Sequence, residues 1–263
     1  MYPPVVPSAL EAHQPLMVFS HPYRWAILSH LAYSDRRVGE LTQLVGQPQN
    51  LVSYHLRELR DAGLVSSRRS SLDGRDMYYR IDLDRCGALL CDTAAALHPA
   101  LRFEASSVTP PRRPGGSPRV LFLCTGNSAR SQMAEALTNT RFAQAVQARS
   151  AGSYPKPLHP NAVRVMAERG IDISGNTSKH LRRYERSHFD YVVTLCDKVR
   201  EVCPEFPGVP HRIHWSMPDP AAEGSADSET FPAFERTVQE LEVRIPQLVA
   251  QLFAPQGGTA NER

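Results

Sequence analysis

The stretch Val120-Leu-Phe-Leu-Cys124-Thr-Gly-Asn-Ser-Ala-Arg130-Ser131 decides the fold of the second half of the chain. Its apolar beginning predicts a buried β-strand, and apolar residues at helical spacing after Ser131 predict a helix. Backbone N–H groups in a loop between a strand and a helix point inward, where they cradle a tetrahedral oxyanion and favour a thiolate at Cys124. Arg130 can grip two oxyanion oxygens as a planar fork. The stretch therefore predicts a nucleophilic thiolate that faces a bound phosphate or arsenate.

Length and composition limit the class of protein. A chain of 263 residues has room for two ordinary domains, and 41% hydrophobic with 22% charged residues is typical of a soluble globular protein. No apolar run approaches the ~20 residues that span a bilayer, and residues 1–15 lack the pattern of a secretory signal. We therefore expect residues 1–15 to be a disordered leader and the protein to be cytoplasmic, with no membrane partner.

Net charge and cysteine content limit the kinds of binding and catalysis that the chain could carry out. The net charge of +3 is mild, so any binding of nucleic acid requires a local basic face. Five cysteines in a chain without an export signal favour thiol chemistry over a structural disulfide framework.

A segment rich in Pro, Gly and Ser, residues 105–118, divides the chain. This composition predicts an extended, partly stiff linker. We expect one domain over residues 16–104, a second over residues 119–254, and a polar tail over residues 255–263.

The first domain has the pattern of three helices, a hairpin and a last helix. Helical spacing predicts the helices, and alternating polarity on either side of a turn predicts the hairpin. The expected helices cover residues 23–32, 38–45, 49–62 and 84–97, and the strands begin at residue 64 and cover residues 77–81. This order is that of a winged helix-turn-helix, an α+β fold.

Four motifs in this domain match a known family. They are Val38-Gly-Glu-Leu-Thr-Gln-Leu-Val45, Leu51-Val-Ser-Tyr-His-Leu-Arg-Glu-Leu59, Ala62-Gly-Leu-Val65, and Asp73-Gly-Arg75 followed by Tyr78-Tyr79. Residues 21–97 therefore resemble the ArsR-type regulators. The resemblance implies a DNA operator as partner and a homodimer formed through the winged-helix domain.

The predicted third helix has one face suited to DNA. Leu56 and Leu59 are expected to face the core, which leaves polar residues on the opposite face, where a recognition helix presents side chains to base edges. Arginines on the wing could contact phosphates. The candidate DNA-binding residues are Gln49, Asn50, Ser53, Tyr54, Arg57, Arg68, Arg69 and Arg75. The alternative is a solvated helix in a winged helix that docks another protein.

Strands and helices alternate in the second domain. Strands are expected over residues 119–123, 147–151, 191–195 and 213–215, and helices over residues 131–139, 160–169 and 231–253. This alternation predicts an α/β domain with a parallel sheet and flanking helices. The cysteine loop then lies at the carboxyl end of the first strand, where ligands bind in open α/β sheets.

Several motifs of this domain match a second family. They are Cys124-Thr-Gly-Asn-Ser-Ala-Arg-Ser-Gln-Met-Ala-Glu135, Ser150-Ala-Gly152, Gly170-Ile-Asp-Ile-Ser174, Thr177-Ser178, Val192-Val-Thr-Leu-Cys196, Cys203-Pro204, and Trp215 followed by Pro218-Asp-Pro220. Residues 119–253 resemble the thioredoxin-coupled arsenate reductases, which share the fold of the low-molecular-weight tyrosine phosphatases.

This resemblance implies the roles of the oxyanion site. Cys124 attacks arsenate, Ser131 donates a hydrogen bond to its thiolate, and Asp219 is the general acid that protonates the leaving oxygen. The oxyanion-binding loop is Thr125, Gly126, Asn127, Ser128, Ala129 and Arg130, in which Asn127 holds the loop conformation. The alternative for Asp219 is an ordinary turn carboxylate.

The resemblance also implies a relay of thiols. Cys196 attacks Cys124 and releases arsenite, and Cys203 then attacks Cys196 and carries the disulfide to an external reductant, thioredoxin or another thiol system. No tightly bound cofactor is expected. If residues 197–202 are helical, the Cα atoms of Cys196 and Cys203 lie ~10 Å apart, beyond the ~7 Å limit of a disulfide. We therefore expect this segment to unwind on oxidation. The alternative is a pair of core cysteines.

Three positions depart from the family pattern. Ala129 stands where many members have a further cysteine, which a three-cysteine relay does not need. Lys179 stands where some members carry an acidic residue that helps bind potassium, which argues against a potassium site here. Ala221-Ala222 replaces the tyrosine pair of true tyrosine phosphatases and argues against phosphotyrosine as substrate.

Cys86 and Cys91 are the two cysteines outside this relay. They are candidate thiolate ligands for arsenite, and soft thiolates suit such a ligand. Their spacing puts them ~140° apart on a helix, so a second thiol from a dimer partner would be needed. Ordinary buried cysteines in a helix seam are an equal alternative.

Taken together, the motifs predict a DNA-binding regulator fused to an arsenate reductase. The first alternative is a low-molecular-weight protein tyrosine phosphatase that carries a winged-helix regulatory or interaction module. The second is a pure regulator with a relic catalytic domain, against which the intact cysteine set, Arg130 and Asp219 argue.

Overall fold

The structure is a computed structural model that describes residues 14–72, 74–101, 116–202 and 211–253. Its contacts divide the chain into two units, Met1–Ser107 and Val108–Arg263, each with its own hydrophobic core. The division falls within residues 105–118, where the composition predicts a linker. Among the described helices, none has the length and apolar character needed to cross a membrane.

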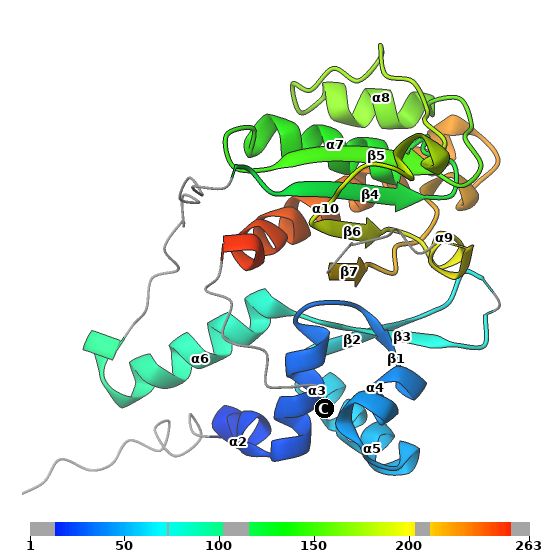
Figure 1. Ribbon diagram of the computed structural model, residues 1–263. Helices are drawn as coiled ribbons and strands as arrows, with labels where there is room; N and C mark the ends of the chain where they lie inside the picture. Colours follow the sequence, from blue (N-terminus) through cyan, green and yellow to red (C-terminus); the bar gives the residue numbers. More distant parts are fainter. Residues whose placement is uncertain (1–13, 73, 102–115, 203–210, 254–263) are drawn as a thin grey trace, which may run out of the picture. The chain divides into compact units, whose positions relative to one another are not determined.

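The first unit is a winged helix-turn-helix, as predicted. Its elements are α2 (Gln14–Ser20), α3 (Pro22–Leu31), β1 (Arg36–Arg37), α4 (Val38–Val45), α5 (Gln49–Asp61), β2 (Val65–Arg69), β3 (Met77–Ile81), α6 (Leu83–Leu97) and the 3-10 turn η1 (Pro99–Leu101). The strands form an antiparallel sheet in the order β1-β3-β2 (Figure 1). In the hairpin, Val65 pairs with Ile81 and Arg69 with Met77.

Local chemistry explains the helix-turn-helix boundaries. Gly46 ends α4 with a φ of 66°, a left-handed conformation that glycine adopts without a steric penalty. Pro48 precedes α5. Within α5, Val52, Leu56 and Leu59 are buried in the core of the unit, at the helical spacing that the sequence predicts.

Two elements of this unit go beyond the prediction. α2 begins at Gln14, two residues inside the expected leader. β1 has only two residues, Arg36 and Arg37, which pair with Tyr79 and Tyr78, 43 and 41 positions further along the chain. A strand of two residues has no periodicity of its own, so only the sheet reveals it.

The second unit is an α/β domain. Its elements are β4 (Arg119–Cys124), α7 (Arg130–Arg141), β5 (Gln147–Gly152), α8 (Pro160–Ala167), the 3-10 turn η2 (Leu181–Tyr184), β6 (Tyr191–Thr194), α9 (Asp197–Val202), β7 (His211–His214), the 3-10 turn η3 (Pro220–Ala222) and α10 (Asp227–Phe253). The four strands are parallel and ordered β5-β4-β6-β7. The predicted parallel sheet is confirmed.

The strand order places the cysteine loop at the middle of the sheet edge. β4 lies between β5 and β6, and Val120, Leu121, Phe122 and Leu123 are fully buried. α7 packs against β4 and β5, while α10 packs against α7 and α8 (Figure 1). Residues 125–129 connect the end of β4 to the start of α7 at the carboxyl edge, where β5 and β6 also end.

Candidate active site

Cys124 is the last residue of β4 and is buried. Its sulfur lies 3.2 Å from the backbone N–H donor of Asn127 and 2.9 Å from the hydroxyl of Ser131. Both contacts come from the loop and the first turn of α7, which surround the sulfur with donors. The sulfur of the candidate nucleophile therefore lies within hydrogen-bond reach of two such groups.

Asn127 organises the loop through its side chain. Its backbone φ of 47° is the one positive value of a non-glycine residue within the described ranges. The side-chain Nδ2 donates to Ser131 Oγ at 2.9 Å and to Ser150 Oγ at 2.8 Å. Because an amide nitrogen only donates, the Ser131 oxygen is the acceptor there, and its hydroxyl proton is left for the Cys124 sulfur.

The segment after β5 holds the loop from its other side. The backbone N–H groups of Tyr154, Lys156 and His159 donate to the carbonyls of Thr125, Gly126 and Ser128, respectively. Gly152, at the end of β5, lies so close to the loop backbone that an added Cβ would be 2.5 Å from the Thr125 carbonyl oxygen. Only glycine fits at this approach of two backbones.

Arg130 begins α7 and is buried. Its Nη1 donates to the carbonyls of Met217 and Pro218 at 3.0 and 3.1 Å, and its Nη2 lies 3.3 Å from Asp219 Oδ1. These bonds orient the guanidinium and place it beside the expected general acid, whose side chain is half exposed. Within the described residues, Arg130 Nε is buried without a hydrogen-bond partner.

Cys196 follows β6 and is buried beside the same loop. Its sulfur lies 3.3 Å from Thr125 Oγ1. Burial raises the pKa of the Cys196 thiol, Arg130 opposes this effect, and the neighbouring Cys124 adds to it. Cys196 therefore contacts Thr125, the residue next to Cys124, although 71 positions separate Thr125 from Cys196 in the chain.

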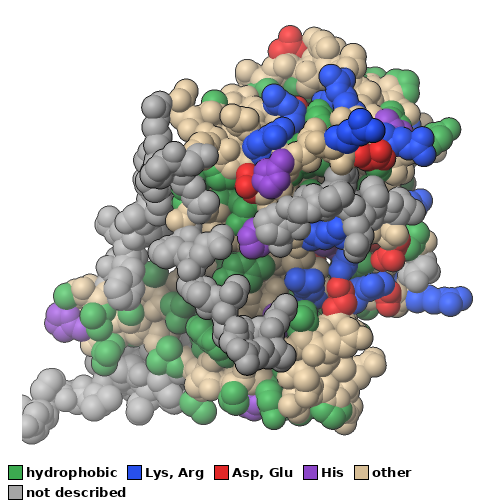
Figure 2. Space-filling view, viewed as in Figure 1, with side chains coloured by type: hydrophobic (Ala, Val, Ile, Leu, Met, Phe, Trp, Pro, Cys, Tyr) green, Lys and Arg blue, Asp and Glu red, His purple; other side chains and the backbone are tan. Residues whose placement is uncertain are grey.

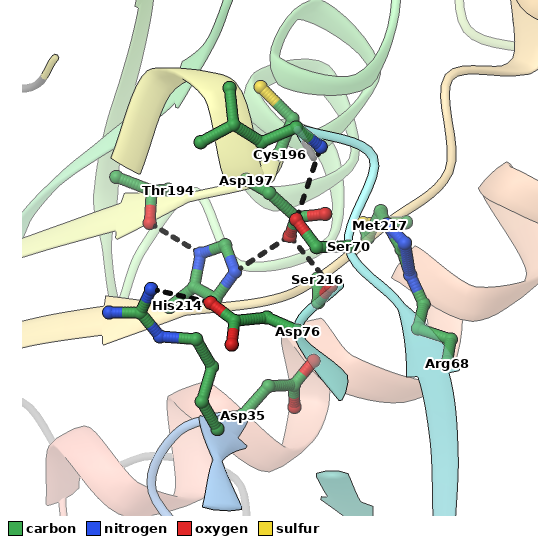
Figure 3. Close-up of polar contacts among 12 residues, drawn as sticks. Asp35, Arg68, Ser70, Asp76, Thr194, Cys196, Asp197, His214, Ser216 and Met217 are labelled. Carbon is green, nitrogen blue, oxygen red and sulfur yellow. Dashed lines mark hydrogen bonds and ion pairs between the residues drawn. The ribbon is translucent and has the colours of Figure 1, made fainter. Parts of the chain in front are cut away.

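A polar cluster lies directly after Cys196 (Figure 3). Asp197 Oδ1 accepts a hydrogen bond from Ser216 Oγ at 2.7 Å and lies 3.1 Å from His214 Nε2, while His214 Nδ1 lies 2.8 Å from Thr194 Oγ1. These contacts join the start of α9 to β6 and β7. α9 is helical over the described part of the segment that we expect to unwind. Cys203 lies outside the described residues.

The candidate DNA-binding residues lie on α5 and on the wing. Gln49, Asn50, Ser53, Tyr54 and Arg57 are all exposed, opposite the buried residues of the same helix. The Arg57 guanidinium lies 5.6 Å from the centre of the Tyr54 ring. On the wing, Arg69 and Arg75 are exposed and Arg68 is half-buried. The polar face therefore has the exposure that contact with DNA requires.

Cys86 and Cys91 both lie on α6. Cys86 is buried, and burial raises its pKa to about 11, with a further contribution from Asp82. Cys91 is half-buried. The described residues include no group of three or more His, Cys, Asp and Glu side chains placed to hold a metal ion.

Some residues around the site were given no role by the sequence. Gln132, Ser150, Gly152 and Lys179 contact the loop through side chains or backbone, and Glu135 contacts Ser150 and Lys179. Four of them lie inside motifs that carry the family resemblance, and Lys179 follows one directly. Their position in or beside those motifs was the one sequence signal for a role at the site, because the sequence assigned none of them a role as nucleophile, general acid or ligand.

Comparison with known proteins agrees with this geometry. Residues 119–256 match the family described as low molecular weight phosphotyrosine protein phosphatase. Residues 21–67 match the family described as bacterial regulatory protein, arsR family.

Individual relatives match the second unit. A protein named arsenate reductase from Halalkalibacterium halodurans is 41% identical over 126 residues, which are 48% of this chain and 91% of that protein. Proteins of the same name from Brevibacillus brevis and Bacillus subtilis are 42% and 39% identical, and the matched parts cover 48% and 49% of this chain and 90% and 92% of theirs. The chain therefore belongs to the low molecular weight phosphotyrosine protein phosphatase family, with arsenate reductases as relatives, and carries an ArsR-family regulatory domain before it.

Proposed function

We propose that the chain is a bifunctional arsenic-resistance protein. Its second unit reduces arsenate to arsenite through Cys124, Cys196 and Cys203, with thioredoxin or a similar dithiol as the external reductant. Its first unit binds an operator in DNA. The observation that carries the proposal is the second buried thiol, Cys196, held 3.3 Å from a residue of the oxyanion loop.

The first step forms a bond between sulfur and arsenic. The Cys124 thiolate attacks arsenate while Arg130 and the loop N–H groups hold the other oxygens. Asp219, beside Arg130, supplies a proton to the oxygen that leaves as water. Ser131 stabilises the sulfur before the attack through the hydroxyl that Asn127 orients.

The second step reduces the arsenic. The Cys196 thiolate attacks Cys124, a disulfide forms, and the electron pair of the broken sulfur–arsenic bond stays on arsenic, which leaves as arsenite. Cys203 then attacks Cys196 and frees Cys124. Two thiols of the external reductant finally reduce the Cys196–Cys203 disulfide. A hydrolytic phosphatase would need only the first thiol.

Production of arsenite tests the proposal. Purified protein is supplied with arsenate, thioredoxin, thioredoxin reductase and NADPH, and the variants Cys124→Ser, Cys196→Ser and Cys203→Ser are compared with Cys91→Ser as the matched control. We expect many turnovers in the wild type and in Cys91→Ser, and none in the other three. Turnover of an aryl phosphate but not arsenate, unaffected by Cys196→Ser, would instead assign the unit to the phosphatases.

We propose a homodimer for the first unit. Hydrophobic side chains gather where α6 lies on the surface (Figure 2), and Leu90 and Leu97 are 44% and 80% exposed. α2, which contacts α6, exposes Leu16 and Met17. A second copy would cover this apolar surface, and the mass of the protein in solution checks it.

Sensing of arsenite by Cys86 and Cys91 is a separate part of the proposal. Burial disfavours the thiolate at Cys86, so arsenite would have to displace its proton. Release of operator DNA by arsenite, lost in Cys86→Ser and Cys91→Ser, tests this part separately.

A further inference from the structure

We propose that Lys179 is a positioning residue of the oxyanion loop, in which its ammonium group acts as a built-in cation. Its charge holds Glu135 in place, and Glu135 in turn holds the serine that orients Asn127. The inference rests on the proposed function only in taking Cys124 as the nucleophile. It assigns Lys179 and Glu135 a role in preparing that thiolate.

A continuous chain of contacts runs from Lys179 to Cys124. Lys179 Nζ lies 3.0 Å from Glu135 Oε2, and Ser150 Oγ donates to the same carboxylate oxygen. Asn127 Nδ2 donates to Ser150 Oγ and to Ser131 Oγ, and Ser131 Oγ contacts the Cys124 sulfur.

The direction of each hydrogen bond in this chain follows from chemistry. The Asn127 amide nitrogen only donates, so both serine oxygens accept from it. The Ser150 proton must then go to Glu135, which accepts it as a carboxylate. The Ser131 proton goes to Cys124 Sγ. An ionised Glu135 therefore favours the arrangement in which the cysteine receives a hydrogen bond.

The ion pair is screened little by water. The Lys179 and Glu135 side chains are only 15% and 14% exposed, and Ser150 is fully buried. Removing one partner of a buried pair leaves the other charge uncompensated, which is costly. A carboxylate in that state would bind another cation from solution.

Lys179 also contacts the loop through its backbone. Its N–H donates to Asn127 Oδ1 at 2.7 Å, a bond that every substitution except proline retains. A change of the side chain therefore removes the cation while it leaves this second link intact. That separation makes the role of the charge measurable.

The test is the alkylation of Cys124 by iodoacetamide in the full-length chain, followed by peptide mass spectrometry as a function of pH. We expect Lys179→Met to slow the reaction at neutral pH about tenfold, the effect of one weakened hydrogen bond to a charged group. Lys179→Arg should stay near the wild type. Lys198→Met, which removes an exposed lysine, is the matched control.

Restoring the alkylation rate of Lys179→Met with salt distinguishes a role of the Lys179 charge from a role of its side chain in packing. Addition of about 0.1 M potassium chloride should restore alkylation in Lys179→Met, whereas tetramethylammonium chloride, too large for the site, should not. The double variant Lys179→Met/Glu135→Gln should lose the response, because no carboxylate remains to bind the ion.

Two results would overturn the inference. One is a wild-type rate and pH profile in Lys179→Met. The other is a slow Lys179→Met that neither potassium nor Arg restores, which would assign Lys179 to packing. Alkylation requires no arsenate, so failure of the chain to reduce arsenate would refute the proposed function and leave this test valid.

Discussion

At the scale of single residues, Asn127 determines the geometry of the oxyanion loop. Its left-handed backbone turns the loop, and its amide contacts Ser131, Ser150 and the Lys179 N–H. Asn is among the few residues that adopt this conformation and also offer two donors and an acceptor. The loop is therefore organised by the side chain of one of its own residues.

Gly152 gives a prediction at this scale. Gly152→Ala places a Cβ 2.5 Å from the Thr125 carbonyl oxygen, so the loop must shift. We expect the free energy of unfolding to fall by about 1–3 kcal/mol and arsenate turnover by about 100-fold. Gly175→Ala is the control, since nothing lies within 4 Å of its Cβ position. Equal turnover in both variants would show that the approach of the backbones is not needed.

Cys196 gives a prediction about pH. Burial raises its pKa above the ordinary 9.0, so at neutral pH only a small fraction is the reactive thiolate. The rate of the proposed step that joins Cys124 and Cys196 in a disulfide should therefore rise about tenfold per pH unit below that pKa. Single-turnover release of arsenite, measured between pH 6 and about 8.5, checks this. Thr125→Val removes a hydrogen bond that lowers the pKa of Cys196, and should therefore slow the disulfide step further. A rate that does not change with pH would contradict the role of Cys196 as the attacking thiolate.

At the scale of elements, α5 has two faces with separate tasks. Its outer face exposes the candidate DNA contacts, and its inner face buries Val52, His55, Leu56 and Leu59. Substitutions on one face should leave the task of the other unchanged.

The outer face gives a DNA-binding prediction. Arg57→Ala should weaken binding to a DNA site selected in vitro about ten- to a hundredfold, because one contact to bases or phosphates is lost. Thermal unfolding should not change. Arg182→Ala, an exposed arginine of the second unit, removes the same charge and serves as the control in the gel-shift assay. An equal loss of affinity in both variants would indicate a net-charge effect only.

The inner face gives a stability prediction. His55 is buried, and neither of its ring nitrogens has a hydrogen-bond partner among the described residues. Burial is the largest cause that lowers the pKa of His55 below 6.5, and the charges of His21 and Arg24 lower it further. The charge of Glu58 has the opposite effect. The unfolded chain therefore binds this proton more readily, so stability is full above about pH 6.5 and is lost as pH falls.

Chemical denaturation at pH 5 and at pH 7.5 measures this effect. His55→Leu should lose less stability between these values than the wild type and remain as stable at the higher pH, because a buried unsatisfied polar group is removed. His98→Leu replaces an exposed histidine of the same unit and should keep the wild-type difference. Identical losses in all three proteins would exclude His55 as the titrating group.

At the scale of the whole molecule, two separate cores imply two folding units. A fragment of residues 116–263 should fold and reduce arsenate at the rate of the intact chain, and a fragment of residues 1–104 should bind DNA. Circular dichroism and the two activity assays check these outcomes. Failure of either fragment to fold would show that the units depend on each other for stability.

The sequence by itself determined most of the helices and strands, the nucleophile loop and the two families, whereas α2 and β1 were not predicted. The predicted bounds of α4 and β3 match the structure, and the other predicted helices and strands lie within a few residues of the observed ones. This was possible because helical spacing, alternation and turn residues are local signals, and a loop between a strand and a helix is read from consecutive residues.

Only the tertiary structure decided which side chains meet around that loop. Three contacts join residues from different parts of the chain. They are the ion pair between Lys179 and Glu135, the close approach of Gly152 to Thr125, and the hydrogen bond from Arg130 to the Met217 carbonyl. Their encounter depends on the strand order β5-β4-β6-β7 and on the pairing of β4 with β5. Strand order and register are set by packing of the whole sheet, which no local pattern contains.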